Sequence, residues 1–285
     1  MPTPRVAAIH DLSGFGRCSL TVALPVLSVM GLQCCPVPTA WLSTHTGGFE
    51  GFTFLDLTDE MPRTARHWQS LELEFQAVYS GFLGSERQIS MVSDFIQTFR
   101  RNDTLVVVDP VMGDHGKVYK TYTPAMCAGM ARLAEQADVI TPNLTEAALL
   151  LGVPYPELPA GEAGLREIVT ALSLEGRRSV VLTGAALSPD STGAMYFDAR
   201  TGTVGHARVP LVSRDFCGTG DLFASVLTGA LVKGRALPEA VRQAAEFVHA
   251  CCVRTAAQNL PVREGVDFEP LLHLLAGEPD TAAHP

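Results

Sequence analysis

Near the middle of the chain, an apolar run ends on a carboxylate and then turns at a proline: Leu105-Val106-Val107-Val108-Asp109-Pro110-Val111-Met112-Gly113-Asp114. Successive apolar residues without polar alternation are typical of a strand buried on both faces. Similar short runs occur at Val6–His10, Ala77–Ser80, Val139–Thr141 and Val180–Thr183. These runs predict the strands of a mostly parallel sheet.

Helical stretches separate these runs, so the chain is expected to be an α/β protein with helices on both faces of its sheet. The helices are expected at Cys18–Met30, Glu86–Arg101, Pro124–Gln136, Thr145–Leu151 and Ala163–Glu175.

The pattern changes in the last third of the chain. Ala194–Asp198 and Thr203–Val209 flank a turn that ends in Gly202, which predicts a β-hairpin. Two long helices are expected to follow, near Gly220–Lys233 and Pro238–Ala257. No repeat or linker is evident, so we expect one domain over residues 1–285, with a frayed tail from about 277 to 285.

Composition narrows the range of partners. The chain has 285 residues, is 18% charged and carries a net charge of -9, with no basic run to follow a phosphate backbone. We therefore expect no nucleic-acid partner. No apolar stretch reaches the roughly 20 residues of a bilayer helix. The seven cysteines lack zinc-site spacing, and the first residues do not resemble a signal peptide, so we expect a cytoplasmic protein with reduced thiols.

The strongest local signal is Cys217-Gly218-Thr219-Gly220-Asp221, which precedes an apolar helix. Glycines let the backbone approach a ligand, and the first amides of a helix bind anions. Gly218, Thr219 and Gly220 are thus candidates for an anion hole around a transferring phosphoryl group. Asp221 is the candidate catalytic base that takes a hydroxyl proton. A glycine-rich turn with Asp221 stabilising a helix start is the alternative.

Two further motifs end predicted strands. Asn143-Leu144-Thr145-Glu146 reads as a capping box, and the same two polar side chains can organise a hydrated metal beside a nucleotide. Asp109 and Asp114 have two interpretations. They are ordinary residues of a turn, or they are carboxylates that hold Mg²⁺ through water. The polar segment His115–Tyr122 is expected to form a mobile lid.

The sequence of the first loop, His10-Asp11-Leu12-Ser13-Gly14-Phe15-Gly16, nearly matches the glycine-rich fingerprint of dinucleotide-binding proteins. The third glycine is missing, and Cys34–Ala40 holds no acidic residue for a ribose, so we reject that interpretation. We interpret the segment as a substrate loop, in which Asp11 pairs with a heteroaromatic nitrogen. Thr44-His45-Thr46 would add polar contacts, although a merely solvated histidine remains the alternative.

Taken in order, these segments resemble the pyridoxal kinase branch of the ribokinase-like superfamily, over about Val6 to Ala257. The residues that carry the resemblance are Ala8-Ile9-His10-Asp11, Thr44-His45-Thr46-Gly47, Ser80-Gly81-Phe82-Leu83-Gly84-Ser85, Asp109-Pro110-Val111-Met112-Gly113-Asp114, Thr141-Pro142-Asn143-Leu144-Thr145-Glu146, Val181-Leu182-Thr183-Gly184 and Gly218-Thr219-Gly220-Asp221. Each segment alone is weak evidence for the family, but the occurrence of all of them in this order along the chain is specific.

The resemblance implies a three-layer αβα sandwich, a homodimer, and the use of ATP with Mg²⁺ and a monovalent cation, K⁺. By position, Asp221 matches the catalytic base, and Glu146 and Asp109 match metal positions reached through water. Nucleotide-binding positions match Asp109, Asp114, Thr141, Asn143, Glu146, Thr183 and Gly184. Substrate-binding positions match Asp11, Ser13, His45, Thr46, Phe82 and Asp221.

Two departures from the pattern bear on the substrate. Asp11 stands where many pyridoxal kinases have Ser, and Phe82 where many have Tyr. An Asp in the first loop also resembles the hydroxymethylpyrimidine kinases of thiamine synthesis. We therefore expect ATP-dependent phosphorylation of the 5′-hydroxymethyl group of pyridoxal, pyridoxine or pyridoxamine. The alternatives are the same reaction on hydroxymethylpyrimidine, and a non-catalytic vitamin- or nucleotide-binding protein.

Overall fold

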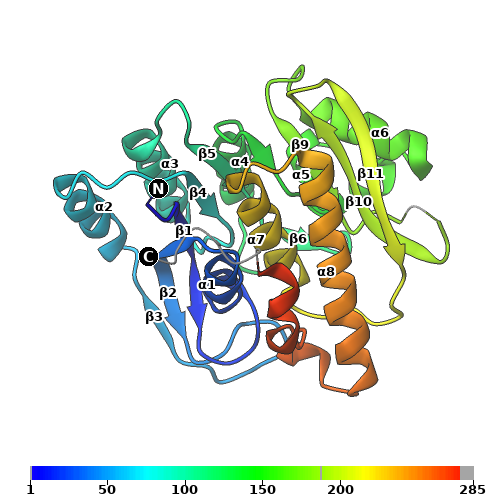
Figure 1. Ribbon diagram of the computed structural model, residues 1–285, viewed down its shortest axis with the longest axis horizontal. Helices are drawn as coiled ribbons and strands as arrows, with labels where there is room; N and C mark the ends of the chain where they lie inside the picture. Colours follow the sequence, from blue (N-terminus) through cyan, green and yellow to red (C-terminus); the bar gives the residue numbers. More distant parts are fainter. Residues whose placement is uncertain (1, 187, 277–285) are drawn as a thin grey trace, which may run out of the picture.

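A nine-stranded sheet runs through the computed structural model, which describes residues 2–186 and 188–276 (Figure 1). The strand order across the sheet is β11-β10-β9-β8-β5-β4-β1-β2-β3. The strands are β1 (Arg5–Ser13), β2 (Gln33–Leu42), β3 (Phe54–Asp56), β4 (Ala77–Ser80), β5 (Leu105–Val108), β8 (Val139–Ile140), β9 (Ser179–Thr183), β10 (Ser191–Asp198) and β11 (Thr203–Pro210).

The six central strands, from β9 to β2, run parallel. Their carboxyl ends therefore meet at one edge of the sheet, where ligands bind in open α/β folds. β3 and β10 join the sheet antiparallel, on opposite sides. β10 and β11 pair along their length, with Phe197 opposite Val204, which confirms the predicted hairpin.

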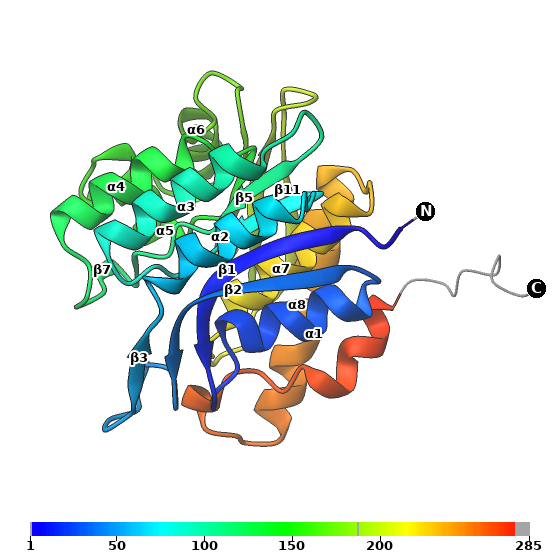
Figure 2. The same cartoon turned by 90° about the vertical axis from the view of Figure 1, so that its left-hand side faces the viewer.

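Helices cover both faces of the sheet, as Figure 2 shows. One core contains Leu20, Val226 and Val241, from α1, α7 and α8. The other core contains Phe95, Met130 and Ile168, from α3, α4 and α6. The helices are α1 (Ser19–Val29), α2 (Glu60–Ser70), α3 (Glu86–Phe99), α4 (Pro124–Ala134), α5 (Leu144–Leu151), α6 (Gly161–Leu172), α7 (Thr219–Val232) and α8 (Leu237–Ala257). This three-layer αβα sandwich confirms the predicted fold class.

Some elements have no counterpart in the sequence-based prediction. α2 buries only Met61, and all three residues of β3 are exposed, so neither element contains the run of buried apolar residues that marked the central strands. The predicted lid begins as a small hairpin of β6 (Gly113–Asp114) and β7 (Lys117–Val118), and its last residue, Tyr122, is buried.

The described residues also include three short 3₁₀ helices: η1 (Tyr155–Glu157), η2 (Val262–Glu264) and η3 (Glu269–Leu275). No helix within the described part of the chain has the length and apolar character that crossing a bilayer would require. The frayed tail predicted at about 277–285 lies outside the described residues.

Candidate active site

The predicted site segments gather at the carboxyl edge of the sheet. Asp11 and Ser13 lie at the end of β1, and Thr183 lies at the end of β9. Asp109 directly follows β5, and Thr141 directly follows β8. The fold thus brings the ends of these strands together with the start of α7.

Gly218 is the N-cap residue of α7, with a left-handed backbone at φ 77°. A Cβ atom at this position would overlap the carbonyl oxygen of Arg17, so both the conformation and the space call for glycine. Thr219, Gly220 and Asp221 form the first turn, whose amides lack partners within the helix. The predicted motif therefore occupies the amino terminus of a helix, a place that binds anions.

Asp221 lies in this first turn and is half-buried. Burial raises the pKa of Asp221 to about 7, and the charge of Asp11 adds to the effect, while the backbone amide of Ser19 favours the ionised form and opposes it. A carboxylate with a pKa near neutrality can both accept and release a proton at physiological pH.

Asp11 is buried beside two hydroxyl donors. Ser19 donates to one of its oxygens at 2.6 Å, and Ser13 donates to the other at 2.9 Å. Burial raises the pKa of the Asp11 carboxyl, and these two hydrogen bonds act in the opposite direction. Sequence reasoning missed Ser19 as a site residue; its backbone, at φ 50°, is unusual for a residue other than glycine.

Asp109 and Thr141 come from neighbouring strands and meet directly. The hydroxyl group of Thr141 donates to Asp109 at 2.9 Å, and both side chains are buried. The pKa of Asp109 is raised to about 7. Burial is the main cause and the charge of Asp221 adds to it, whereas the hydrogen bond from Thr141 acts in the opposite direction. The charge of Asp221 therefore affects the ionisation of Asp109.

Asn143 and Glu146 form the predicted capping box at the start of α5. The two oxygens of Glu146 accept from the amide of Asn143 at 2.8 Å and from that of Met112 at 3.1 Å. Asn143 also donates to the carbonyl of Gly113 at 2.9 Å. Burial raises the pKa of Glu146 well above its ordinary value, and Asp109 adds to the shift. The capping reading is confirmed, and the same residues bind the loop that follows β5.

Three predicted nucleotide-binding residues lie at the rim of this edge. Asp114 is exposed and accepts from the amide of His115 at 2.8 Å. The amide of Thr183 donates to the carbonyl of Pro142 at 2.9 Å, and Gly184 follows with φ 63°. Within the described residues, no hydrogen bond joins these three to Asp221.

His45 is buried and uses both ring nitrogens, so it is not merely solvated. Its Nε2 atom donates to the carbonyl of Arg263 at 2.7 Å, and its Nδ1 atom accepts from the amide of Gly47 at 3.0 Å. One neutral tautomer satisfies both bonds. Thr46 is exposed, and the ring of Phe82 lies 6.0 Å from that of Tyr122.

The carboxylates suit a hydrated divalent cation. Across the described ranges, no three His, Cys, Asp or Glu residues lie close enough to enclose a metal by themselves. Burial nevertheless raises the pKa values of Asp109 and Glu146, and neighbouring carboxylates add to both shifts, so a cation would stabilise their ionised forms. Mg²⁺ commonly binds one or two carboxylates while waters and substrate phosphates fill its other positions.

Comparison with known proteins gives the family. A family model described as phosphomethylpyrimidine kinase matches residues 24–266. The chain belongs to this family. The ribokinase-like resemblance seen in the sequence is thereby confirmed, and so is the assignment of the chain as a kinase.

Three relatives illustrate the range of this phosphomethylpyrimidine kinase family. A protein of Bacteroides thetaiotaomicron, assigned as a phosphomethylpyrimidine kinase and crystallised with pyridoxal, is 43% identical, with a TM-score of 0.90 and 98% coverage of both chains. Pyridoxal kinase of Lactobacillus plantarum is 33% identical, with a TM-score of 0.88, covering 96% of this chain and 97% of that one. The pyridoxine/pyridoxal/pyridoxamine kinase of Bordetella avium is 33% identical over 85% of this chain and 82% of its own.

Proposed function

We propose that this kinase transfers the γ-phosphoryl group of ATP to the 5′-hydroxymethyl group of pyridoxal, pyridoxine or pyridoxamine. The observation that carries the proposal is Asp221 in the first turn of α7, directly after the Gly218–Gly220 anion site. The similarity to a protein crystallised with pyridoxal and to two pyridoxal kinases supports the choice of substrate.

In the proposed reaction, the hydroxymethyl oxygen forms a bond to the γ-phosphorus as the bond from that phosphorus to the β–γ bridging oxygen breaks. ADP leaves with the bridging oxygen, and the carboxylate of Asp221 takes the hydroxyl proton. The amides from Gly218 to Asp221 receive the negative charge of the transferring group. Positioning and charge stabilisation supply most of the rate enhancement in reactions of this kind.

On the acceptor side, we assign substrate binding to Asp11, Ser13, His45, Thr46 and Phe82, together with Asp221. Each oxygen of Asp11 accepts one serine hydroxyl and keeps capacity for a further partner, such as a protonated ring nitrogen. His45 is assigned an indirect part, because both of its nitrogens already bind backbone groups.

On the nucleotide side, we assign Asp109, Asp114, Thr141, Asn143, Glu146, Thr183 and Gly184. Asp109 and Glu146 would hold Mg²⁺ through water, and Mg²⁺ when bound would neutralise phosphate charge. From the family resemblance we further propose a dependence on K⁺. Measuring turnover after replacement of K⁺ by a bulky organic cation tests that dependence.

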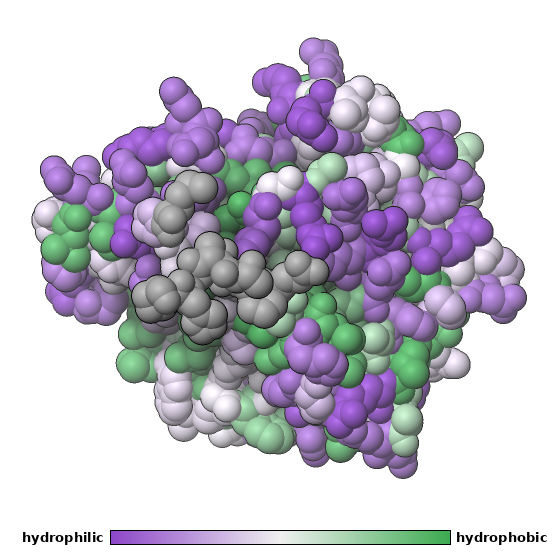
Figure 3. All heavy atoms as spheres, viewed as in Figure 1, coloured by the Kyte–Doolittle hydropathy of each residue, from purple (hydrophilic) through white to green (hydrophobic). Residues whose placement is uncertain are grey.

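We also propose a homodimer that works in the cytoplasm. Trp41, Phe54 and Leu55 are 41%, 58% and 57% exposed on β2 and the edge strand β3, and apolar surface gathers there in Figure 3. Apolar side chains on an edge strand favour pairing with another chain. Light scattering of the wild type and of Phe54→Asp tests the dimer. All seven cysteines are free, which fits a reducing compartment.

The alternative substrate is hydroxymethylpyrimidine, which the family description and Asp11 favour. A non-catalytic binding protein is the remaining alternative, and the carboxylate beside the anion site argues against it. An ATP-consumption assay with the three B6 vitamers and hydroxymethylpyrimidine separates these possibilities. We expect the highest kcat/KM with a B6 vitamer; a preference for hydroxymethylpyrimidine, or no turnover, would contradict the proposal.

A further inference from the structure

Residues 261–269, here called the C-terminal strap, lie against three loops of the candidate site. Three successive carbonyl groups of the strap each accept a hydrogen bond from a different one of these loops. The carbonyl of Val262 accepts from the amide of Cys217 at 3.3 Å, directly before the anion site. The carbonyl of Arg263 accepts from His45, and that of Glu264 accepts from the amide of Arg17 at 3.2 Å. The position of the strap therefore affects all three loops at once.

The backbone of Arg17 is enclosed by two glycines, one from the strap and one from the anion site. A Cβ atom at Gly265 would lie 2.8 Å from the Cβ atom of Arg17 and 2.9 Å from its carbonyl oxygen. A Cβ atom at Gly218 would overlap the same carbonyl oxygen. Contacts this close leave little room for independent movement, so a shift of Arg17 displaces Gly218.

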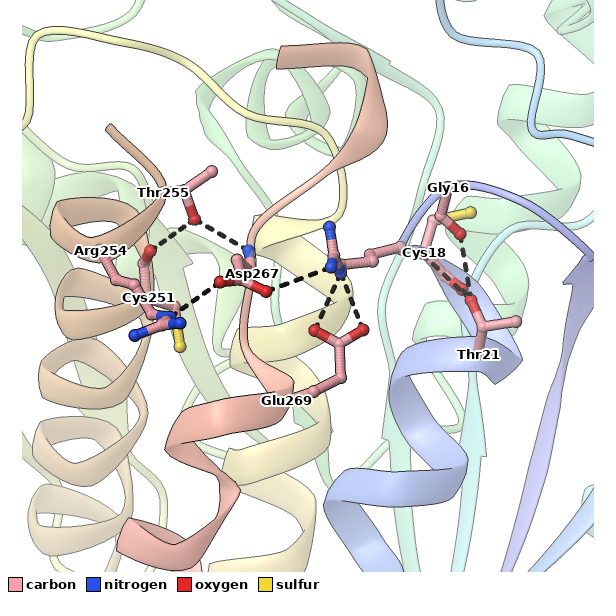
Figure 4. A network of polar contacts seen from close by, with 9 residues as sticks. Gly16, Cys18, Thr21, Cys251, Arg254, Thr255, Asp267 and Glu269 are labelled. Atoms are coloured by element: carbon pink, nitrogen blue, oxygen red, sulfur yellow. Dashed lines mark hydrogen bonds and ion pairs between the residues drawn. The ribbon is translucent and has the colours of Figure 1, made fainter. Parts of the chain in front are cut away.

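A network of charged side chains fixes the strap to the rest of the molecule. The guanidinium group of Arg17 donates to both oxygens of Glu269, at 2.8 and 2.9 Å, and to Asp267 at 3.2 Å. The other oxygen of Asp267 accepts from Arg254 at 2.7 Å. The amide of Asp267 donates to the hydroxyl group of Thr255 at 2.8 Å. Figure 4 shows Asp267 between the α8 residues Arg254 and Thr255 and the loop that leads into α1.

We propose that Arg17 and Asp267 are positioning residues for phosphoryl transfer, which hold the strap so that Gly218 and the His45 loop stay in place. This inference rests on the proposed function. Neither side chain is assigned a contact with the reacting atoms of the proposed phosphoryl transfer. Arginine and carboxylate form strong, geometrically fixed bonds, which suits a positioning role. Misplacement of a catalytic group by about 1 Å can cost on the order of 10²-fold in rate.

Loss of the Arg17–Asp267 contact should leave nucleotide binding unchanged. The strap carbonyls bind the loops around Arg17, His45 and Cys217, whereas Asp109 and Glu146 make their hydrogen bonds with residues near the ends of β5 and β8. A purely structural ion pair would lower stability alone, but a positioning network should lower kcat in the folded enzyme.

The test compares Asp267→Asn with Asp138→Asn in the full chain. Asp138 also accepts from an arginine, Arg100 at 2.5 Å, and from a backbone amide, that of Val106 at 2.8 Å, but it lies just before β8, at the other edge of the sheet. We expect Asp267→Asn to lower kcat about tenfold or more, with the Kd of MgADP unchanged within about twofold. Asp138→Asn should keep wild-type kcat while both variants lose thermal stability.

Hydrogen exchange of the ligand-free protein provides a readout that does not depend on the substrate. Asp267→Asn should speed exchange in peptides that contain the amides of Arg17 and Cys217, whose bonds end on the strap. Arg17→Lys is the milder variant: it keeps the charge but lacks the planar group whose separate nitrogens bind Glu269 and Asp267. It should change kcat and exchange in the same direction by smaller amounts.

Wild-type exchange at both amides in Asp267→Asn and Arg17→Lys would overturn the inference, whatever the substrate proves to be. An equal loss of kcat in Asp138→Asn would also overturn it. If the wild type turns over none of the proposed acceptors, the proposed function fails, and the exchange comparison still decides whether the strap is held as described.

Discussion

The hydroxyl group of Ser19 donates a 2.6 Å hydrogen bond to Asp11, which joins the end of β1 to the first turn of α1. The amide of the same serine favours the ionised form of Asp221, at the start of α7, and so lowers its pKa. Ser19 therefore acts on both Asp11, the proposed substrate-binding carboxylate, and Asp221, the proposed catalytic base. Because burial raises the pKa values of both carboxyl groups, their charge states are the natural subject of experiment.

Replacement of Asp109 tests the energetic cost of its burial. Burial raises the pKa of Asp109 from 3.8 to about 7, so the folded state holds its proton more tightly than the unfolded state does. As the pH rises from about 4 to about 7, this group therefore lowers the free energy of unfolding. Asp109→Asn keeps an acceptor for Thr141 and removes the charge.

We expect the Asn variant to be more stable than the wild type at pH 8, on the order of 1–3 kcal/mol, with a smaller difference at pH 5. Urea unfolding of both proteins at the two pH values measures this. A less stable Asn variant at pH 8 would show that the ionised carboxyl is stabilised by its surroundings. Catalysis should fall in the same variant, since Asp109 is assigned to the metal.

Glu146→Gln should weaken catalysis chiefly through Mg²⁺. The variant keeps an oxygen acceptor for only one of the two amides, those of Asn143 and Met112, and it loses the charge that would bind a hydrated cation. Raising the Mg²⁺ concentration should recover part of the lost activity. Loss of a helix cap costs about 1 kcal/mol in stability.

A cap elsewhere serves as the control. Ser85 caps α3 by accepting from the amide of Gln88 at 3.2 Å. Ser85→Ala should lower the melting temperature without changing the Mg²⁺ dependence. If Glu146→Gln behaves in the same way as this control, Glu146 serves only as a cap.

The segment from His115 to Tyr122 should close as a lid. Its residues 115–121 are exposed, and Tyr122 anchors its end in the core containing Phe82. A closed lid keeps water from the phosphoryl group. Hydrogen exchange in this segment should slow when nucleotide and vitamer bind together. Equal exchange with and without both ligands would remove the lid assignment.

Local patterns made much of the architecture predictable. The central strands are continuous apolar runs, and the spacing of Asn143 and Glu146 alone indicated the capping box. Long-range contacts left no comparable signal. Arg17 and Asp267 lie 250 residues apart in the chain, and only the fold brings them together. Ser19 fell at the start of the predicted helix Cys18–Met30 and appeared to be an ordinary helix residue, because its backbone angle and its hydrogen bond to Asp11 are tertiary properties.

In the proposed reaction, Asp221 accepts the proton of the substrate alcohol. Asp221→Asn keeps the shape of the side chain but has almost no basicity, and it leaves Gly218, the N-cap of α7, in place. Single-turnover and steady-state phosphorylation of pyridoxal by this variant is the most direct measurement. We predict that kcat falls by at least about 10²-fold, with little change in MgADP affinity and no loss of thermal stability. Near-normal turnover by the folded variant, with pyridoxal or with hydroxymethylpyrimidine, would show that Asp221 is not the base.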